Sequence, residues 1–368
     1  MGMNDPSIAI HLPTENKWYA STELARNEAL RGQGKPWAAL IDLLNWWHNG
    51  NTDLEVQSSG STGTPKILKF SREQVKVAAT LSLKAIPIHT GQHALLAMDL
   101  KYVGAKMLVL RSLMANAQLT VVPPSANPLL TLTSEKFHYT AFVPFQISQI
   151  LSNPISKDRL NNTDTVLIGG GSLQPREEDL LEGMKVDFIH TYGMSETLSH
   201  VAIRRLKDRS DGYTLLEGYD FRIGEDGCLI LTTPFCKDEI KTRDLAQSIS
   251  KTTFRLLGRA DFMINSGGVK LFPDPIELKI RKAIQEFSGI HDFMLTGIPD
   301  AMLGEKLIML IEGSEGLKGS LNLILEKIGP LLGRYERPKE IHLCKRLVRN
   351  ENGKVDRVKS LAEFLKGR

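Results

Sequence analysis

The sequence predicts an α/β protein with a large N-terminal domain, built mainly on parallel sheets, and a small α+β C-terminal domain. Short apolar segments with strand character alternate with helical patterns between residues 94 and 189, which is typical of βαβ units. After about residue 212 the segments become shorter and turn-rich, and the last part of the chain mixes strand and helix. We therefore expect a first domain over residues 1–258, ending in a β-rich subdomain, and a second over residues 259–368.

The elements can be assigned from hydrophobic periodicity. Trp37, Leu40, Ile41, Leu44 and Trp47 recur at helical spacing and predict an amphipathic helix that packs on the body of the protein. Further strands are expected at residues 66–70, 94–98, 119–122, 165–168, 186–189 and 307–312. Further helices are expected at residues 105–114, 145–151, 177–184, 275–286 and 321–332.

Composition excludes several protein classes. The chain of 368 residues is 42% hydrophobic and 24% charged, as in an ordinary globular protein. Its net charge of +4 is too small to indicate nucleic-acid binding, although it suits anionic ligands. Three cysteines without CxxC spacing indicate free thiols in a reducing cytoplasm. The N-terminus lacks the pattern of a secretory signal, and no apolar run is long enough to span a membrane.

Residues 58–66, Ser-Ser-Gly-Ser-Thr-Gly-Thr-Pro-Lys, predict a loop that holds phosphate. Glycines let backbone N–H groups turn toward an anion, hydroxyls add donors, and Lys66 adds a positive charge. The small and hydroxyl-bearing residues of the loop are Ser59, Gly60, Ser61, Thr62, Gly63 and Thr64. A flexible linker has a similar composition, but Pro65 stiffens this one and a strand follows it. Pro65 also stands where a Walker A loop has glycine, which disfavours a P-loop nucleoside triphosphatase.

Two more loops follow predicted strands. Gly169, Gly170 and Gly171 come directly after the strand at 165–168, and residues 190–197 follow the next strand. Ligands of parallel sheets bind beyond the carboxyl ends of the strands. Position alone therefore makes both loops candidates for ligand binding.

The loop at 58–66 resembles the phosphate-binding signature of the adenylate-forming superfamily, which includes acyl-CoA synthetases, peptide-synthetase adenylation domains and luciferases. Tyr192-Gly193-Met194-Ser195-Glu196 is similar to a second motif of that superfamily. The resemblance implies that the phosphate loop binds ATP, that Tyr192 stacks on adenine and that Gly193 and Ser195 lie in the nucleotide site. It also implies that Glu196 and Thr62 bind Mg²⁺, and that the glycines at 169–171 lie beside the adenine.

Three further segments resemble motifs of the superfamily. Thr242-Arg243-Asp244 is similar to Thr-Gly-Asp, in which the aspartate accepts the ribose hydroxyls, although Arg243 replaces the glycine. Residues 258–261, Gly-Arg-Ala-Asp, resemble a hinge motif in which Arg259 contacts ribose or phosphate and Asp261 is the pivot of a mobile C-terminal domain. Here Phe262 replaces a second aspartate.

Lys354 lies in a segment similar to Gly-Lys-x-x-Arg, whose lysine bridges the reacting carboxylate and the phosphate. An exposed lysine alone would be ordinary surface, but the preceding Asn352-Gly353 turn can present it at a tip. The resemblance thus adds Lys354 and Lys66, with Glu196 and Thr62, as the catalytic residues.

The segment at 99–111 resembles the o-succinylbenzoyl-CoA synthetases of menaquinone biosynthesis, in which a helix carries an arginine that holds the second carboxylate of the substrate. Arg111 matches that arginine, and Lys106 adds a second cation. The alternative to substrate binding is that Lys106 and Arg111 lie on a solvent-exposed face of the helix. Ser199 and His200 also match this subfamily and are candidates for the acid pocket.

The resemblance implies an AMP-forming ligase that uses Mg²⁺-ATP and CoA to activate a small carboxylic acid. The expected acid is o-succinylbenzoate. The alternatives are a synthetase for a monocarboxylate, an enzyme that loads a carrier protein, and a nucleotide-binding regulator without catalysis.

Overall fold

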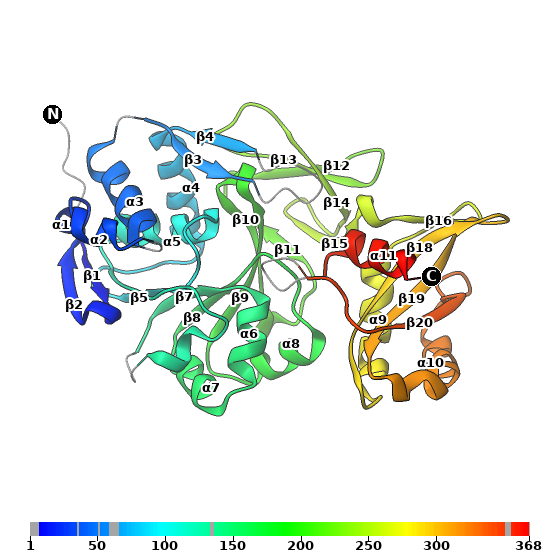
Figure 1. Ribbon diagram of the computed structural model, residues 1–368. Helices are drawn as coiled ribbons and strands as arrows, with labels where there is room; N and C mark the ends of the chain where they lie inside the picture. Colours follow the sequence, from blue (N-terminus) through cyan, green and yellow to red (C-terminus); the bar gives the residue numbers. More distant parts are fainter. Residues whose placement is uncertain are drawn as a thin grey trace. The chain divides into compact units, whose positions relative to one another are not determined.

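Contacts between residues divide the chain into two units, and each is described by itself (Figure 1). The first comprises Met1–Phe221, Leu231–Ile240 and Ser250–Thr253, and the second comprises Arg222–Ile230, Lys241–Ile249 and Phe254–Arg368. The computed structural model describes residues 7–34, 37–50, 52–58, 66–132, 136–349 and 355–367. No helix in those ranges is long and apolar enough to cross a membrane.

Parallel strands form the centre of the first unit. In sheet order the strands are β2 (Lys17–Ala20), β1 (Ala9–Leu12), β6 (Gln118–Val121), β5 (His93–Leu96), β7 (Tyr139–Phe142), β8 (Thr165–Ile168), β9 (Asp187–Met194), β10 (Ser199–Arg205) and β11 (Tyr213–Leu215). Neighbours from β1 through β9 pair parallel, whereas β2, β10 and β11 pair antiparallel. A separate antiparallel pair consists of β3 (Leu54–Gln57) and β4 (Ile67–Phe70).

Helices cover both faces of this sheet (Figure 1). They are α1 (Ser21–Leu24), α2 (Glu28–Gly32), α3 (Trp37–Asn49), α4 (Arg72–Ala85), α5 (Val103–Met114), α6 (Pro144–Leu151), α7 (Pro154–Asn161) and α8 (Pro175–Glu182). Their starts follow from the sequence. The helix α4 begins with a capping box between Ser71 and Gln74, and α6, α7 and α8 each begin with proline, which suits the first helical position.

The central parallel strands of this sheet are buried on both faces, and their successive residues belong to two different cores. Ala94 and Leu96 of β5 pack in the core that contains α3, α4 and α5, whereas Leu95 packs in the core that contains α6, α7 and α8. This alternation follows from the two-residue period of a strand. The predicted βαβ architecture is confirmed, with strand ends at one edge available for ligand loops.

The second unit holds most of the β-rich part predicted after residue 212, together with the C-terminal α+β part. One run of strands is β12 (Asp220–Ile223), β13 (Cys228–Thr232), β14 (Ile240–Ser248) and β15 (Thr253–Arg259). Another sheet contains β17 (Val269–Leu271), β16 (Ile264–Ser266), β19 (Gly304–Gly313), β18 (Ile290–Asp300) and β20 (Glu340–Cys344). The helices are α9 (Pro273–Gln285), α10 (Leu321–Ile328) and α11 (Arg357–Lys366).

The helix predicted at 321–332 is shorter than expected. It ends at Ile328, and Gly329–Leu331 form a turn of 3₁₀ helix, because Pro330 cannot donate an α-helical hydrogen bond. The other predicted helices lie within a few residues of their predicted positions, whereas α1, α2, α4, α7 and α11 were not predicted.

Candidate active site

The predicted phosphate loop starts and ends on the pair formed by β3 and β4. Ser58 N–H donates to the Lys66 carbonyl oxygen over 2.8 Å, and Lys66 N–H donates to Ser58 Oγ over 2.9 Å. These bonds close the base of the loop, and the exposed Lys66 stands at its end. The candidates within the loop lie outside the described residues: Ser59, Gly60, Ser61, Thr62, Gly63 and Thr64.

The loop after Tyr192 makes a sharp turn between β9 and β10. A Cβ atom on Gly193 would lie 1.9 Å from the Ser199 carbonyl oxygen, so only glycine fits there. Leu198 and Ser199 have φ values of 50° and 86°, a region that non-glycine residues rarely adopt. The buried Thr197 stabilises the turn, since its Oγ1 accepts from Met194 N–H and lies 2.6 Å from the Ser199 carbonyl oxygen.

Ser195 connects this turn to the phosphate loop. Its hydroxyl donates to the carbonyl oxygen of Gln57, the last residue of β3, over 3.0 Å. The next residue, Glu196, is half-buried and forms no hydrogen bond or ion pair with any residue of the described ranges. Glu196 thus follows a residue that contacts the strand leading into the phosphate loop, and its carboxylate suits Mg²⁺, which takes one or two carboxylates together with phosphate oxygens.

Within the described residues, no group of three or more acidic, histidine or cysteine side chains could hold a metal by itself. A dedicated all-protein metal cage is also not what Mg²⁺ requires at a nucleotide. A single carboxylate such as that of Glu196 thus fits a metal that arrives with phosphate.

The three glycines that follow β8 lie at the carboxyl edge of the sheet, as predicted. Gly170 has a φ of +82°, and a Cβ on Gly169 would lie 2.7 Å from Thr191 Oγ1. Gly171 has its carbonyl oxygen 2.8 Å from Nε2 of His190. Tyr192 is buried, and its ring centre lies 5.9 Å from that of Tyr213.

Arg111 on α5 is a buried cation without an acidic partner. Only 2% of it is exposed, it forms no ion pair with any residue in the described ranges, and its Nε has no hydrogen-bond partner there. Its positive charge influences the pKa values of three other buried side chains, Tyr139, His200 and Tyr219. Arg111 Nε and the hydroxyls of Tyr139 and Tyr219 all lack hydrogen-bond partners there. The predicted alternative of a solvated helix face is therefore wrong for Arg111.

His200 lies in the same buried group. Its Nε2 is 2.8 Å from the hydroxyl of Ser82, and its Nδ1 is 3.5 Å from Ser199 Oγ. Burial lowers the pKa of His200 well below its usual value, and the Arg111 charge lowers it further. His200 is therefore a neutral hydrogen-bonding group beside Arg111.

Lys106, the other predicted cation of α5, points elsewhere. Its Nζ donates to the carbonyl oxygen of Glu55 over 2.7 Å, and burial lowers its pKa. Since Glu55 belongs to β3, this bond connects α5 to the strand that precedes the predicted phosphate loop.

In the second unit, the residues of the ribose and hinge motifs form one charged network. Arg259 donates to Asp244 Oδ1 over 3.0 Å and to Asp261 Oδ2 over 2.7 Å. Arg243, which replaces the glycine of the family motif, donates to Asp261 Oδ1 over 2.9 Å. Burial acts to raise the pKa of Asp261, but the hydrogen bonds and charges of the two arginines outweigh it and keep that pKa low.

Phe262 and the Gly267-Gly268 pair also have clear roles in the second unit. The guanidinium of Arg357 lies over the Phe262 ring, 5.6 Å from its centre, where the family motif has an aspartate. Gly267 and Gly268 have φ values of 59° and 81° in the turn between β16 and β17, as a two-residue hairpin turn requires. Lys354 lies outside the described residues.

Arg357 is expected to be essential for the stability of the C-terminal part. Its guanidinium binds the buried carboxylate of Glu277 through bonds of 2.6 and 2.8 Å and donates to the Leu295 carbonyl oxygen. Burial raises the pKa of Glu277, an effect that Arg357 opposes. Arg357→Ala should lower the free energy of unfolding by about 3–5 kcal/mol, because it leaves the buried Glu277 with only the more distant cation of Arg281, 3.8 Å away.

Chemical denaturation of the intact chain measures this loss. The double variant Arg357→Met with Glu277→Met should recover most of the stability, since no charge is then left buried. An Arg357→Ala variant as stable as the original chain would contradict the role of the pair.

Acidification is expected to destabilise the first unit through its two buried histidines. Burial, aided by the Arg204 charge, lowers the pKa of His190 to about 4, and His200 is shifted in the same direction. Because both pKa values lie below the unfolded value of about 6.5, the unfolded chain binds more protons as the pH falls. Each histidine should favour unfolding by up to roughly tenfold per pH unit between about pH 6 and 4. Unfolding curves at pH 7, 6 and 5 test this prediction. A free energy of unfolding that does not change over this range would contradict the burial of the two histidines in their neutral form.

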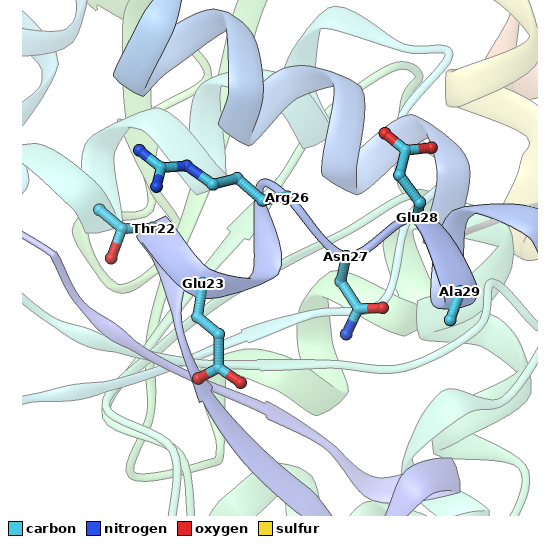
Figure 2. A pocket seen from close by; sticks show the side chains of 6 residues that line it. All are labelled: Thr22, Glu23, Arg26, Asn27, Glu28 and Ala29. Carbon is cyan, nitrogen blue, oxygen red and sulfur yellow. The ribbon is translucent and has the colours of Figure 1, made fainter.

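A surface hollow occurs elsewhere in the first unit, along α1 and α2 (Figure 2). Its walls belong to Thr22, Glu23, Arg26, Asn27, Glu28 and Ala29. Figure 2 shows Glu23 and Arg26 pointing in different directions rather than toward a common centre. These residues belong to none of the motifs, and we assign them no binding role.

Several residues of these sites were not predicted from the sequence. Tyr139 and Tyr219 join the buried group around Arg111, and neither spacing nor composition distinguishes them from ordinary core residues. His190 and Thr197 lie within the loop at 190–197, which was predicted as a ligand loop, but no role was predicted for either side chain.

Comparisons with known proteins agree with this geometry. The model of a family described as AMP-binding enzymes matches residues 57–226. A probable 2-succinylbenzoate–CoA ligase of Mycobacterium tuberculosis is 28% identical over 340 residues, covering 84% of this chain and 84% of the relative. A 2-succinylbenzoate–CoA ligase of Listeria monocytogenes is 24% identical, covering 86% of this chain and 71% of the relative.

Solved structures show the same fold. An AMP-forming acyl-CoA synthetase/AMP-acid ligase II-like protein of Dyadobacter fermentans has a TM-score of 0.61 and 29% identity, covering 94% of this chain and 98% of that one. The o-succinylbenzoate CoA synthetase of Bacillus subtilis, solved with ATP and magnesium, has a TM-score of 0.70 and 18% identity. The match covers 83% of this chain and 69% of that one. The predicted resemblance to adenylate-forming enzymes is confirmed: the family model, the curated relatives and the solved structures all belong to enzymes of this kind.

Proposed function

We propose that the protein is an AMP-forming acid–thiol ligase that converts o-succinylbenzoate, ATP and CoA to o-succinylbenzoyl-CoA, AMP and pyrophosphate. The curated relatives that match most of the chain are ligases for this acid. We place the enzyme in the cytoplasm, which its three free cysteines support.

The observation that carries the choice of acid is the buried Arg111, which has no acidic partner among the described residues. A buried cation without an acidic partner is costly, and an anionic ligand would remove that cost. An arginine can donate two hydrogen bonds to one carboxylate, and the hydroxyls of Tyr139 and Tyr219 are two further donors that have no acceptor among the described residues. A dicarboxylate suits this group, since one carboxylate can bind here while the other reacts.

In the first step, a carboxylate oxygen of the acid attacks the α-phosphorus of ATP. The bond between the α-phosphorus and the bridging oxygen breaks, pyrophosphate leaves, and an acyl-adenylate forms. We assign the phosphates to the loop at 58–66 and Lys66, the adenine to Tyr192 and the glycines at 169–171, and the ribose to Asp244 and Arg259. Mg²⁺ would be held by Glu196, with Thr62, and supplies charge neutralisation at the phosphates. Lys354 stabilises the charge that develops on the reacting oxygens.

In the second step, the thiol of CoA loses its proton and attacks the carbonyl carbon of the adenylate, and AMP leaves. We propose that the C-terminal domain turns about Asp261 between the steps, withdrawing Lys354 and presenting the Gly267-Gly268 turn. The bonds from Arg243 and Arg259 to Asp261 support a pivot whose carboxylate is firmly held.

Exchange of labelled pyrophosphate into ATP tests the first step. We expect exchange with o-succinylbenzoate and Mg²⁺, and exchange lower by roughly 10²-fold or more with either of its monomethyl esters, because one ester lacks the nucleophile and the other lacks the anchor. Benzoate is the matched monocarboxylate control. Equal exchange with benzoate would favour a monocarboxylate synthetase, and ATP binding without exchange would favour a regulator.

A further inference from the structure

We propose that His190 is a positioning residue for ATP, because its fixed tautomer anchors the carbonyl oxygen of Gly171 and so holds the loop at residues 169–171. The proposal rests on the proposed function, which assigns that loop to the adenine. His190 belongs to none of the motifs that identify the nucleotide site.

The hydrogen bonds of His190 determine which ring nitrogen carries the proton. Its Nδ1 lies 3.1 Å from a terminal nitrogen of Arg204 and 3.0 Å from the hydroxyl of Tyr213. A guanidinium can only donate, so Nδ1 must accept and carries no proton. The proton of the neutral ring is therefore on Nε2, which lies 2.8 Å from the Gly171 carbonyl oxygen and donates to it.

The neighbours of His190 keep the ring in place. It is 3% exposed, and Arg204, which contacts Nδ1, is paired with Glu178 on α8. Tyr213, the other group at Nδ1, also faces Tyr192, with ring centres 5.9 Å apart. His190 thus connects the glycine loop to the side chains around Tyr192, the two elements assigned to adenine.

The loop needs such an anchor because its conformation is unusual. Gly170 has a φ of +82°, and glycine is the residue that loses most conformational freedom when it is ordered. A loop with three successive glycines has no side chains of its own to hold it. The bond from His190 to Gly171 supplies a fixed point at the end of this segment.

The neutral state of His190 is stable under working conditions. Burial and the adjacent Arg204 lower the pKa of His190 to about 4, so the ring stays neutral near pH 7. The pattern of one accepting and one donating nitrogen is then permanent, unlike that of a histidine that titrates during catalysis.

Two variants distinguish the hydrogen bonds made by Nδ1 of His190 from the bond made by its Nε2. The side chain of His190→Asn is short, so its amide reaches the position of Nδ1 but not Gly171; that of His190→Gln is longer and can still donate to the Gly171 carbonyl oxygen. We expect His190→Asn to raise the Kd for ATP, measured by calorimetry, roughly tenfold, and His190→Gln to raise it less than about threefold. In turnover assays KM for ATP should follow Kd, with kcat changed much less.

His93→Asn is the matched control. His93 forms a 2.7 Å hydrogen bond to Thr120 Oγ1 at the opposite, amino end of β5, so its loss should lower stability without changing the Kd for ATP. Unaltered ATP binding by His190→Asn, or equal weakening by the Asn and Gln variants, would overturn the proposal. If the original chain binds no ATP, the proposed function fails, and that result is seen before any variant is measured.

Discussion

Replacing Arg111 by methionine is expected to stabilise the protein while it abolishes selection for a dicarboxylate. In the described residues no acid compensates the buried guanidinium, so its burial works against folding. A methionine of similar length removes the charge and keeps most of the packing in α5. We expect the free energy of unfolding to rise by about 1–4 kcal/mol.

The same substitution should lower kcat/KM for o-succinylbenzoate by roughly 10²-fold or more, because the second carboxylate loses its charged partner. A monocarboxylate such as benzoate should be affected far less. Arg111→Lys keeps the charge but loses the forked geometry, so its activity should be intermediate. A methionine variant that is less stable and equally active on o-succinylbenzoate would contradict the assignment of Arg111.

Replacing Lys354 by alanine should affect one half of the reaction selectively. The cation is expected to stabilise charge during adenylation, and its loss should slow acid-dependent pyrophosphate release by roughly 10²-fold or more. Transfer of a preformed acyl-adenylate to CoA should change little, because the proposed rotation removes Lys354 from the second step. Rapid-quench measurements of each half-reaction separate the two effects.

Lys359→Ala is the control for Lys354→Ala. Lys359 is an exposed lysine of α11, paired only weakly with Asp356 over 3.2 Å, and its removal should leave both half-reactions unchanged. Equal loss in the two half-reactions of the Lys354 variant would indicate damage to the fold or to substrate binding rather than to adenylation.

The helices and parallel strands could be predicted because their apolar residues repeat with a clear period. The strand β7 was missed, since all four of its residues, Tyr139–Phe142, are buried and no alternation distinguishes it. The predicted helix at 321–332 was too long because the pattern was followed past Pro330. In both cases the pattern of apolar residues along the chain does not show which structure the folded protein adopts there.

The motifs predicted which loops matter, but not what holds them. Arg243 was a departure from the family pattern in the sequence, and the structure shows it bound to the carboxylate of Asp261, the residue proposed as the hinge. Arg111 could be proposed as a substrate ligand, but its lack of an acidic partner depends on residues far apart in the chain. The same is true of His190, whose role depends on contacts with Gly171, Arg204 and Tyr213.

Product identification is the most direct test of the proposed reaction. The purified chain would be incubated with o-succinylbenzoate, ATP, Mg²⁺ and CoA, and the products would be identified by mass spectrometry. We expect o-succinylbenzoyl-CoA and AMP in equal amounts, with none formed when CoA or the acid is omitted. Adenylate that accumulates without any CoA thioester, or a thioester formed equally well from benzoate, would contradict the proposed function.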